Sequence, residues 1–249
     1  MIELKSQADL EKLRVAGRAA AETLKKISES IRQGVSTKEL DDIAFACISA
    51  RGMKPGFLGY RGYPATACVS INEEVVHGIP RANRKLKTGD IVSVDLGVIS
   101  GGFYGDCAAT FPVGAVSANA LRLMQVTKEC LVKGIEAVRP GNRLGDVSAA
   151  IQKHAESNGF SVVRDYVGHG IGRNLHEEPA VTNFGQAGTG VRLEPGMVIC
   201  IEPMINEGAC EVKTLSDGWT VVTKDGKLCA HEEHMVAVTI DGYEILTER

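Results

Sequence analysis

Two aspartates in neighbouring β-rich segments are the first candidates for chemistry in this chain of 249 residues. Residues 91–99 and 102–111 flank Ser100-Gly101, which predicts a β-hairpin with a two-residue turn, although a longer loop is the alternative. That turn would place Asp95 directly opposite Asp106, with Cβ atoms about 5 Å apart. Because opposed carboxylates repel each other and neither strand offers Lys or Arg beside them, the pair indicates a cation site rather than a solvated hairpin tip.

Three further residues have side chains that bind metals. Glu202 ends one apolar segment and Glu233 begins another, where a lone buried acid would be costly; Glu232 is the alternative to Glu233 by position. His169 lies among glycines that permit close approach of the backbone to a bound group, although a lone histidine there is more often structural. Four carboxylates and one imidazole form an oxygen-rich set suited to Mn, Fe(II), Co or Zn, and five ligands require two ions.

Helical spacing of apolar residues follows Ser6 and Ser36, each with an acid three positions later that completes a capping box. These signals predict helices that end by Gly34 and near Gly52. A second helix pair is predicted over residues 121–138 and 144–159.

The two helix pairs are related by a shift of 107 residues. The shift carries five residues onto identical ones: Arg32, Gly34, Gly52, Leu86 and Gly89 onto Arg139, Gly141, Gly159, Leu193 and Gly196. It also carries the apolar segment 91–95 onto 198–202, and both segments end in an acid. The sequence therefore predicts one catalytic domain over 1–249, with halves of roughly 1–112 and 113–249 about a pseudo-twofold axis.

The composition is that of an ordinary globular protein, with 44% hydrophobic and 24% charged residues. A net charge of -3 without runs of like charge disfavours nucleic acid and anionic membranes as partners. Neither a signal peptide nor a membrane span is visible, and seven scattered cysteines fit reduced thiols. We expect a cytoplasmic monomer.

The ordered motifs V-D-L-G, Y-G-D, G-H-G-I-G, I-E-P-M and E-H carry Asp95, Asp106, His169, Glu202 and Glu233. Together with segments 59–64, 70–73, 77–80, 176–179 and 217–220, this set resembles the type I methionine aminopeptidases over nearly the whole chain. The resemblance implies an α+β pita-bread (creatinase/aminopeptidase) fold, with two pseudo-twofold-related halves, an antiparallel sheet and outer helices. It also implies a bacterial-type enzyme without an N-terminal extension.

The resemblance further implies that a metal-bridging hydroxide hydrolyses the N-terminal methionine from nascent or new polypeptides with a small second residue, near the ribosome. The five residues above become ligands of two divalent ions, Co, Mn, Fe(II) or Zn, and Glu202 is also the proton shuttle. His77 and His176 would contact the scissile peptide and stabilise its tetrahedral intermediate, a role suited to imidazole donors. Taken alone, either histidine would more simply be a core residue.

The methionine pocket implied by the resemblance consists of Phe57, Tyr60, Tyr63, Cys68, His77, Leu175, His176 and Trp219. This chain has Phe57 where a cysteine is frequent in the family and Leu175 where a phenylalanine is frequent. Our hypothesis is compensation, in which a larger residue on one wall and a smaller one on the other keep the pocket volume.

Two other functions fit parts of this pattern. An X-Pro aminopeptidase or prolidase would share the five ligands but usually carries an additional N-terminal domain. A non-catalytic pita-bread binding module would have lost ligands, whereas all five are present.

Overall fold

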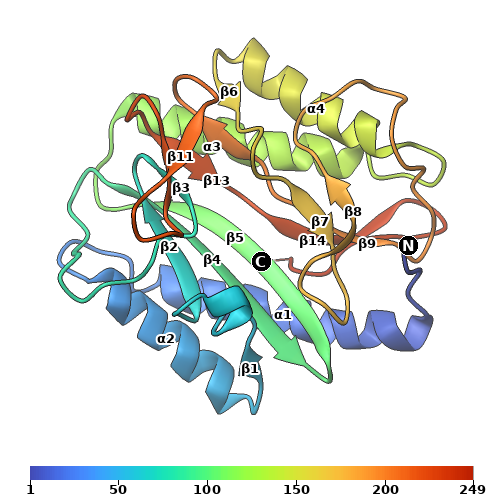
Figure 1. Ribbon diagram of the computed structural model, residues 1–249, viewed down its shortest axis with the longest axis horizontal. Helices are drawn as coiled ribbons and strands as arrows, with labels where there is room; N and C mark the ends of the chain where they lie inside the picture. Colours follow the sequence, from blue (N-terminus) through green and yellow to red (C-terminus); the bar gives the residue numbers. More distant parts are fainter. Residues whose placement is uncertain (249) are drawn as a thin grey trace.

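Four helices form the outer layers of the computed structural model, which describes residues 1–248. They are α1 (Gln7–Ser28), α2 (Thr37–Ala50), α3 (Ala118–Glu136) and α4 (Leu144–Ser157). Ser6 and Ser36 begin the first two with the predicted capping boxes, so the local signals located these helices correctly. Figure 1 shows α1 and α2 on one side of the strands and α3 and α4 on the other.

Every strand pair between the helical layers is antiparallel, as the resemblance implied. One sheet contains β1 (Lys54–Pro55), β2 (Ala67–Ile71), β4 (Ile91–Ser100) and β5 (Phe103–Pro112). A second contains β15 (Tyr243–Ile245), β14 (His234–Val238), β9 (Val198–Ile201), β7 (Gly168–Gly170) and β8 (Glu177–Val181). Two small sheets contain β13 (Cys229–His231), β10 (Met204–Asn206) and β6 (Ser161–Val162), and β11 (Val212–Thr214), β12 (Val221–Thr223) and β3 (Glu74–Val76). A 3₁₀ turn, η1, covers Tyr60–Gly62.

The predicted pairing of the two aspartates is wrong by two residues. The turn between β4 and β5 is Gly101-Gly102, with φ of 56° and 80°, so Asp95 lies opposite Ala108 and Asp106 opposite Gly97. Two successive glycines accept the positive φ angles that a tight hairpin turn needs, and Ser100 would not. Because side chains alternate with a period of two, this shift leaves both aspartates on the same face as diagonal neighbours.

Backbone hydrogen bonds repeat with the predicted shift of 107 residues. The amide of Gly34 donates to the carbonyl of Leu86 over 2.8 Å, and the equivalent amide of Gly141 donates to Leu193 over 3.1 Å. Each helix pair covers its own sheet through a separate apolar core, one around β4 and one around β9. These repeats confirm the two pseudo-twofold-related halves of a pita-bread fold.

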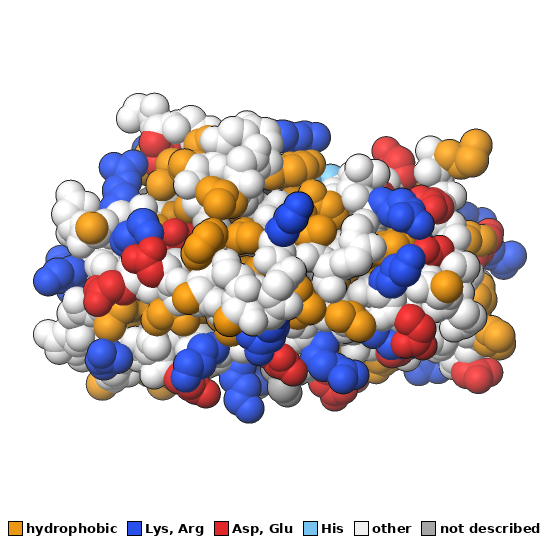
Figure 2. Space-filling model, turned by 90° about the horizontal axis from the view of Figure 1, so that it is seen from below, with side chains coloured by type: hydrophobic (Ala, Val, Ile, Leu, Met, Phe, Trp, Pro, Cys, Tyr) orange, Lys and Arg blue, Asp and Glu red, His pale blue; other side chains and the backbone are white. Residues whose placement is uncertain are grey.

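The helices are amphipathic, with buried apolar faces and charged outer faces. Figure 2 views the α1 and α2 side and shows Lys, Arg, Asp and Glu interspersed with apolar side chains. Within residues 1–248, no helix combines the length and apolar character that crossing a membrane requires.

Candidate active site

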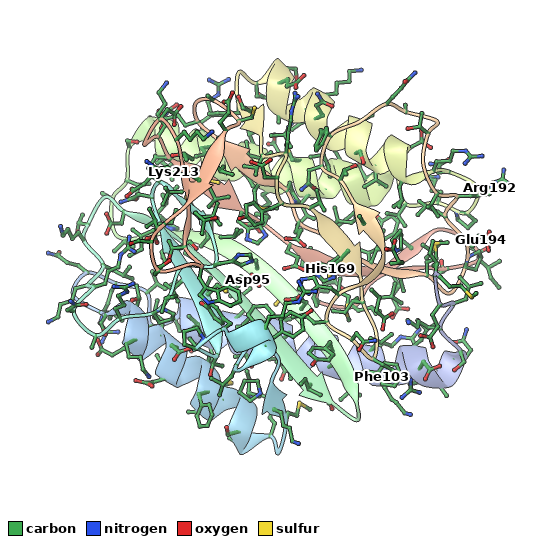
Figure 3. All side chains as sticks on the ribbon, in the orientation of Figure 1. Asp95, Phe103, His169, Arg192, Glu194 and Lys213 are labelled. Carbon is green, nitrogen blue, oxygen red and sulfur yellow. The ribbon has the colours of Figure 1, made fainter. Side chains whose placement is uncertain are left out.

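A cavity of about 290 Å³ contains every site residue that the sequence singled out. Its walls also include Arg61 and Tyr166, which sequence reasoning missed. The lining residues are Phe57, Tyr60, Arg61, Tyr63, Cys68, His77, Asp95, Asp106, Tyr166, His169, Leu175, His176, Glu202, Trp219 and Glu233. Figure 3 shows Asp95 and His169 near each other in the centre of the molecule, between the two helical layers.

The acidic side chains come from both central sheets. Asp95 and Asp106 lie on β4 and β5, whereas Glu202 directly follows β9 and Glu233 directly precedes β14. The amide of Glu233 donates to the carbonyl of Ala108 over 3.0 Å, which ties the second sheet to the first. The acids of the two halves therefore meet because the halves are hydrogen-bonded to each other at this point.

Glu233, and not Glu232, lines the cavity. The carboxylate of Glu232 accepts a hydrogen bond from the Thr110 amide at 3.2 Å instead. The geometry thus favours Glu233 as the site residue of this pair.

His169 reaches the acids from β7. Its Nε2 lies 3.5 Å from Oε1 of Glu202 and 3.8 Å from Oδ2 of Asp106. Its Nδ1 lies 2.9 Å from the carbonyl oxygen of Gly170, an acceptor, so Nδ1 carries the proton and Nε2 offers a lone pair to the acidic centre.

The glycines around His169 lie against neighbouring strands. A Cβ at Gly168 would lie 2.2 Å from the carbonyl oxygen of Cys200, and one at Gly170 would lie 2.2 Å from that of Glu178. The glycines therefore permit close packing of neighbouring strands, and approach of the backbone to a bound group stays a prediction.

Burial strongly disfavours charge on these acids. It raises the pKa of Asp95 from 3.8 to about 7. Burial, followed by the charges of Glu233 and Asp95, raises the pKa of Asp106 well above its usual range, and burial with the charges of Asp95 and Asp106 does the same for Glu202. These three carboxyls can all be ionised at once only if a cation offsets the repulsion between them.

The donor atoms fit a divalent metal. Oδ1 of Asp95 and Oδ1 of Asp106 are buried without a hydrogen-bond partner among residues 1–248, which is costly unless a cation occupies the centre. Asp106, His169, Cys200 and Glu233 each offer a ligand atom, and these four atoms lie within 4.8 Å of one another. Cys200 is a buried free thiol, as the sequence predicted, and alternation along β9 puts it on the same side as Glu202.

The other wall of the cavity is apolar. Phe57, Tyr63, Cys68 and Leu175 are buried in one cluster, and the rings of Tyr63 and Trp219 meet edge to face at 5.1 Å. Phe57 packs over Gly97 so closely that a Cβ there would lie 2.7 Å from Cε1 of the ring. The cavity thus joins an acidic end to an apolar wall.

Two histidines also line the cavity. His77 has φ of 60°, and its ring meets Trp219 edge to face at 6.1 Å. Burial and His176 lower the pKa of His77 to about 4. Burial and Arg61 lower the pKa of His176. Both imidazoles are therefore neutral near pH 7, each with one donor and one acceptor nitrogen.

Comparison with known proteins agrees with this architecture. The family described as metallopeptidase family M24 matches residues 11–240. Methionine aminopeptidase A of Synechocystis sp. is 52% identical over 246 residues, which cover 99% of this chain and 97% of that protein. The crystal structure of methionine aminopeptidase from Thermotoga maritima is 47% identical, with a TM-score of 0.99 and full coverage of both chains.

The crystal structure of a prolidase from Pyrococcus horikoshii has a TM-score of 0.80 at 20% identity. The match covers 98% of this chain and 63% of the prolidase chain, and at this low identity it shows the shared fold alone. The family match and the identities over almost the whole chain agree with the combination of buried acids, His169 and an apolar wall. The chain therefore belongs to metallopeptidase family M24 and, within it, to the methionine aminopeptidases.

Proposed function

We propose that the protein hydrolyses the peptide bond after an N-terminal methionine, in a reaction that depends on divalent metal. The observation that carries this function is a single cavity in which Asp95, Asp106, Glu202 and Glu233 face an apolar wall. The acidic end suits a free amino terminus, and the apolar wall suits an unbranched thioether.

Five residues would hold the metal: Asp95, Asp106, His169, Glu202 and Glu233. When bound there, a pair of divalent ions lowers the pKa of a water molecule and polarises the substrate carbonyl. The proposal of two ions rests on the number of ligands, and counting metal per chain by plasma emission after gel filtration tests it.

Glu202 is suited to move the proton. It follows the last residue of β9, and Asn183 donates to its backbone carbonyl over 3.1 Å, which fixes its position at the strand end. At this place its carboxylate would take a proton from the attacking water and return it to the leaving amine.

His77 and His176 are suited to donate hydrogen bonds to the oxygen on which negative charge develops. Both line the cavity and both are neutral near pH 7, so each offers one N–H without adding charge. Phe57, Tyr63, Cys68, Leu175 and Trp219 would surround the methionine side chain.

The experiment compares two peptides that differ in their first two residues. Purified protein supplied with Mn²⁺ is given Met-Ala-Ser-Lys and Ala-Pro-Ser-Lys, and the products are identified by mass spectrometry. Release of methionine from the first peptide alone supports the proposal. Cleavage of only the second would replace it with an X-Pro peptidase, and cleavage of neither would favour a binding module.

Several details stay predictions of the sequence. The preference for a small second residue is tested by the series Met-Ala, Met-Val, Met-Leu and Met-Phe, in which turnover should fall with side-chain size. The identity of the metal, action near the ribosome, the monomeric state and the cytoplasmic location are predictions of the same kind.

A further inference from the structure

Tyr60 has a contact that a simple wall of the methionine pocket does not need. Its hydroxyl oxygen lies 2.8 Å from Nδ1 of His176, and the two rings are 5.3 Å apart at 40°. The His176 ring also meets the ring of His169, whose centroid is 4.3 Å away at 60°. The imidazole is therefore held between a tyrosine and a residue of the acidic centre.

The direction of the hydrogen bond follows from its two partners. Among residues 1–248, the Tyr60 hydroxyl has Nδ1 of His176 as its hydrogen-bond partner and no other. A phenolic hydroxyl is a stronger hydrogen-bond donor than acceptor, and an imidazole nitrogen that carries no proton is a strong acceptor, so the hydroxyl donates to Nδ1. With Nδ1 as the acceptor, the imidazole proton resides on Nε2.

The segment that carries Tyr60 is held in an unfavourable conformation. Gly59 has φ of 82° and Gly62 has φ of 89°, and between them Arg61 has φ of 48°, which few residues with a side chain adopt. Hydrogen bonds from the amide of Tyr60 to Phe57 and from that of Tyr63 to Tyr60, both 2.9 Å, keep the turn closed. Such strain at Arg61 persists only where the surroundings enforce it.

We propose that Tyr60 is a positioning residue for the hydrolysis, whose hydroxyl keeps His176 in the tautomer that presents Nε2–H to the substrate. This inference rests on the proposed function, because His176 must use that N–H to stabilise the developing oxyanion. Without the hydroxyl, the two neutral tautomers are both populated, and the Nδ1–H form offers the substrate an acceptor in place of a donor. The expected loss is that of one hydrogen bond, about five- to tenfold in kcat.

The decisive readout is the tautomer itself. Protein labelled with ¹⁵N-histidine is studied by long-range ¹H–¹⁵N NMR, both metal-free and loaded with diamagnetic Zn²⁺, and His176→Gln assigns the signal. We expect the wild type to have Nε2 protonated and Tyr60→Phe to show a tautomer mixture. An Nδ1–H tautomer in the wild type, or an unchanged tautomer in Tyr60→Phe, overturns the proposal whether or not the protein releases methionine.

Kinetics separate positioning from lining of the pocket. Tyr60→Phe keeps the ring, so kcat should fall five- to tenfold while KM changes less than twofold, and the substitution should cost nothing further in a His176→Ala background. A rise in KM at constant kcat would instead assign Tyr60 to the pocket wall and overturn the proposal. Tyr243→Phe, at an exposed position of β15, is the matched control and should behave as wild type. If the wild type itself releases no methionine, the proposed function fails, and the NMR result still decides the tautomer.

Discussion

Replacing Asp95 with asparagine should stabilise the metal-free protein, by an amount that grows with pH. Burial raises the pKa of Asp95 in the folded chain to about 7 from 3.8. Between these values the folded state holds a proton that the unfolded state lacks, so this contribution to stability is lost as pH rises through 7. Asp95→Asn has no proton to lose and escapes that penalty.

The magnitude follows from the two pKa values. Between pH 5 and pH 8, the contribution of a fully buried carboxyl with this shift to the free energy of unfolding would fall by about 2.6 kcal/mol. Because Asp95 is partly exposed, we expect a fall of about 2 kcal/mol. In a chain of this length that corresponds to a difference of roughly 4–8 °C in Tm between variant and wild type. Relief of repulsion on Asp106 and Glu202 acts in the same direction.

The assay is thermal unfolding of chelator-treated protein at pH 5, 6, 7 and 8. His77 and His169, whose pKa values are lowered to about 4 and about 3, titrate in the opposite sense in both proteins. The quantity to follow is therefore the difference between Asp95→Asn and wild type. A difference that is constant with pH, or that shrinks as pH rises, would refute the electrostatic interpretation of the acidic centre.

Three further predictions concern packing. Lys5 is buried in an ion pair with Glu177 at 2.6 Å, so Lys5→Met should lower the free energy of unfolding in urea by about 2–3 kcal/mol. Adding Glu177→Leu should restore part of that loss, and no recovery would argue against the ion pair. Gly105→Ala should cost about 3 kcal/mol or more by the same assay, because its Cβ would lie 2.3 Å from the backbone of α1; a wild-type midpoint would contradict this contact. Phe57 and Leu175 line one cavity, so the effects of Phe57→Cys and Leu175→Phe on kcat/KM should offset each other. Additive effects of the two substitutions would contradict the compensation hypothesis.

Local signals were enough to predict the helices. Capping boxes at Ser6 and Ser36 and the glycines that follow each helix depend only on residues a few positions apart. The hairpin register was harder, because Ser100-Gly101 and Gly101-Gly102 are both acceptable turns by composition. The choice depends on two positive φ angles that only the glycine pair accepts readily.

The assembly of the site depends on contacts between distant parts of the chain. Nothing local to Glu233 says that its amide binds the carbonyl of Ala108, and that contact brings the two sheets together. Motif resemblance supplied the residue list, and the structure gathered those residues in one cavity. Arg61 lies within segment 59–64, but the resemblance assigned it no role, and Tyr166 belongs to no motif that we used; only the folded chain brings both side chains to the cavity.

The most direct test of the central claim is metal-dependent release of methionine. Protein stripped of metal by a chelator is incubated with Met-Ala-Ser before and after addition of Mn²⁺ or Co²⁺, and free methionine is quantified, with Asp106→Ala as the control. Our account predicts no release without metal, restored release with it, and at least a thousandfold lower turnover in the variant, on the order of 4 kcal/mol of lost transition-state stabilisation. Full activity of the stripped protein, or of Asp106→Ala, would contradict the assignment of the acidic centre as the catalytic metal site.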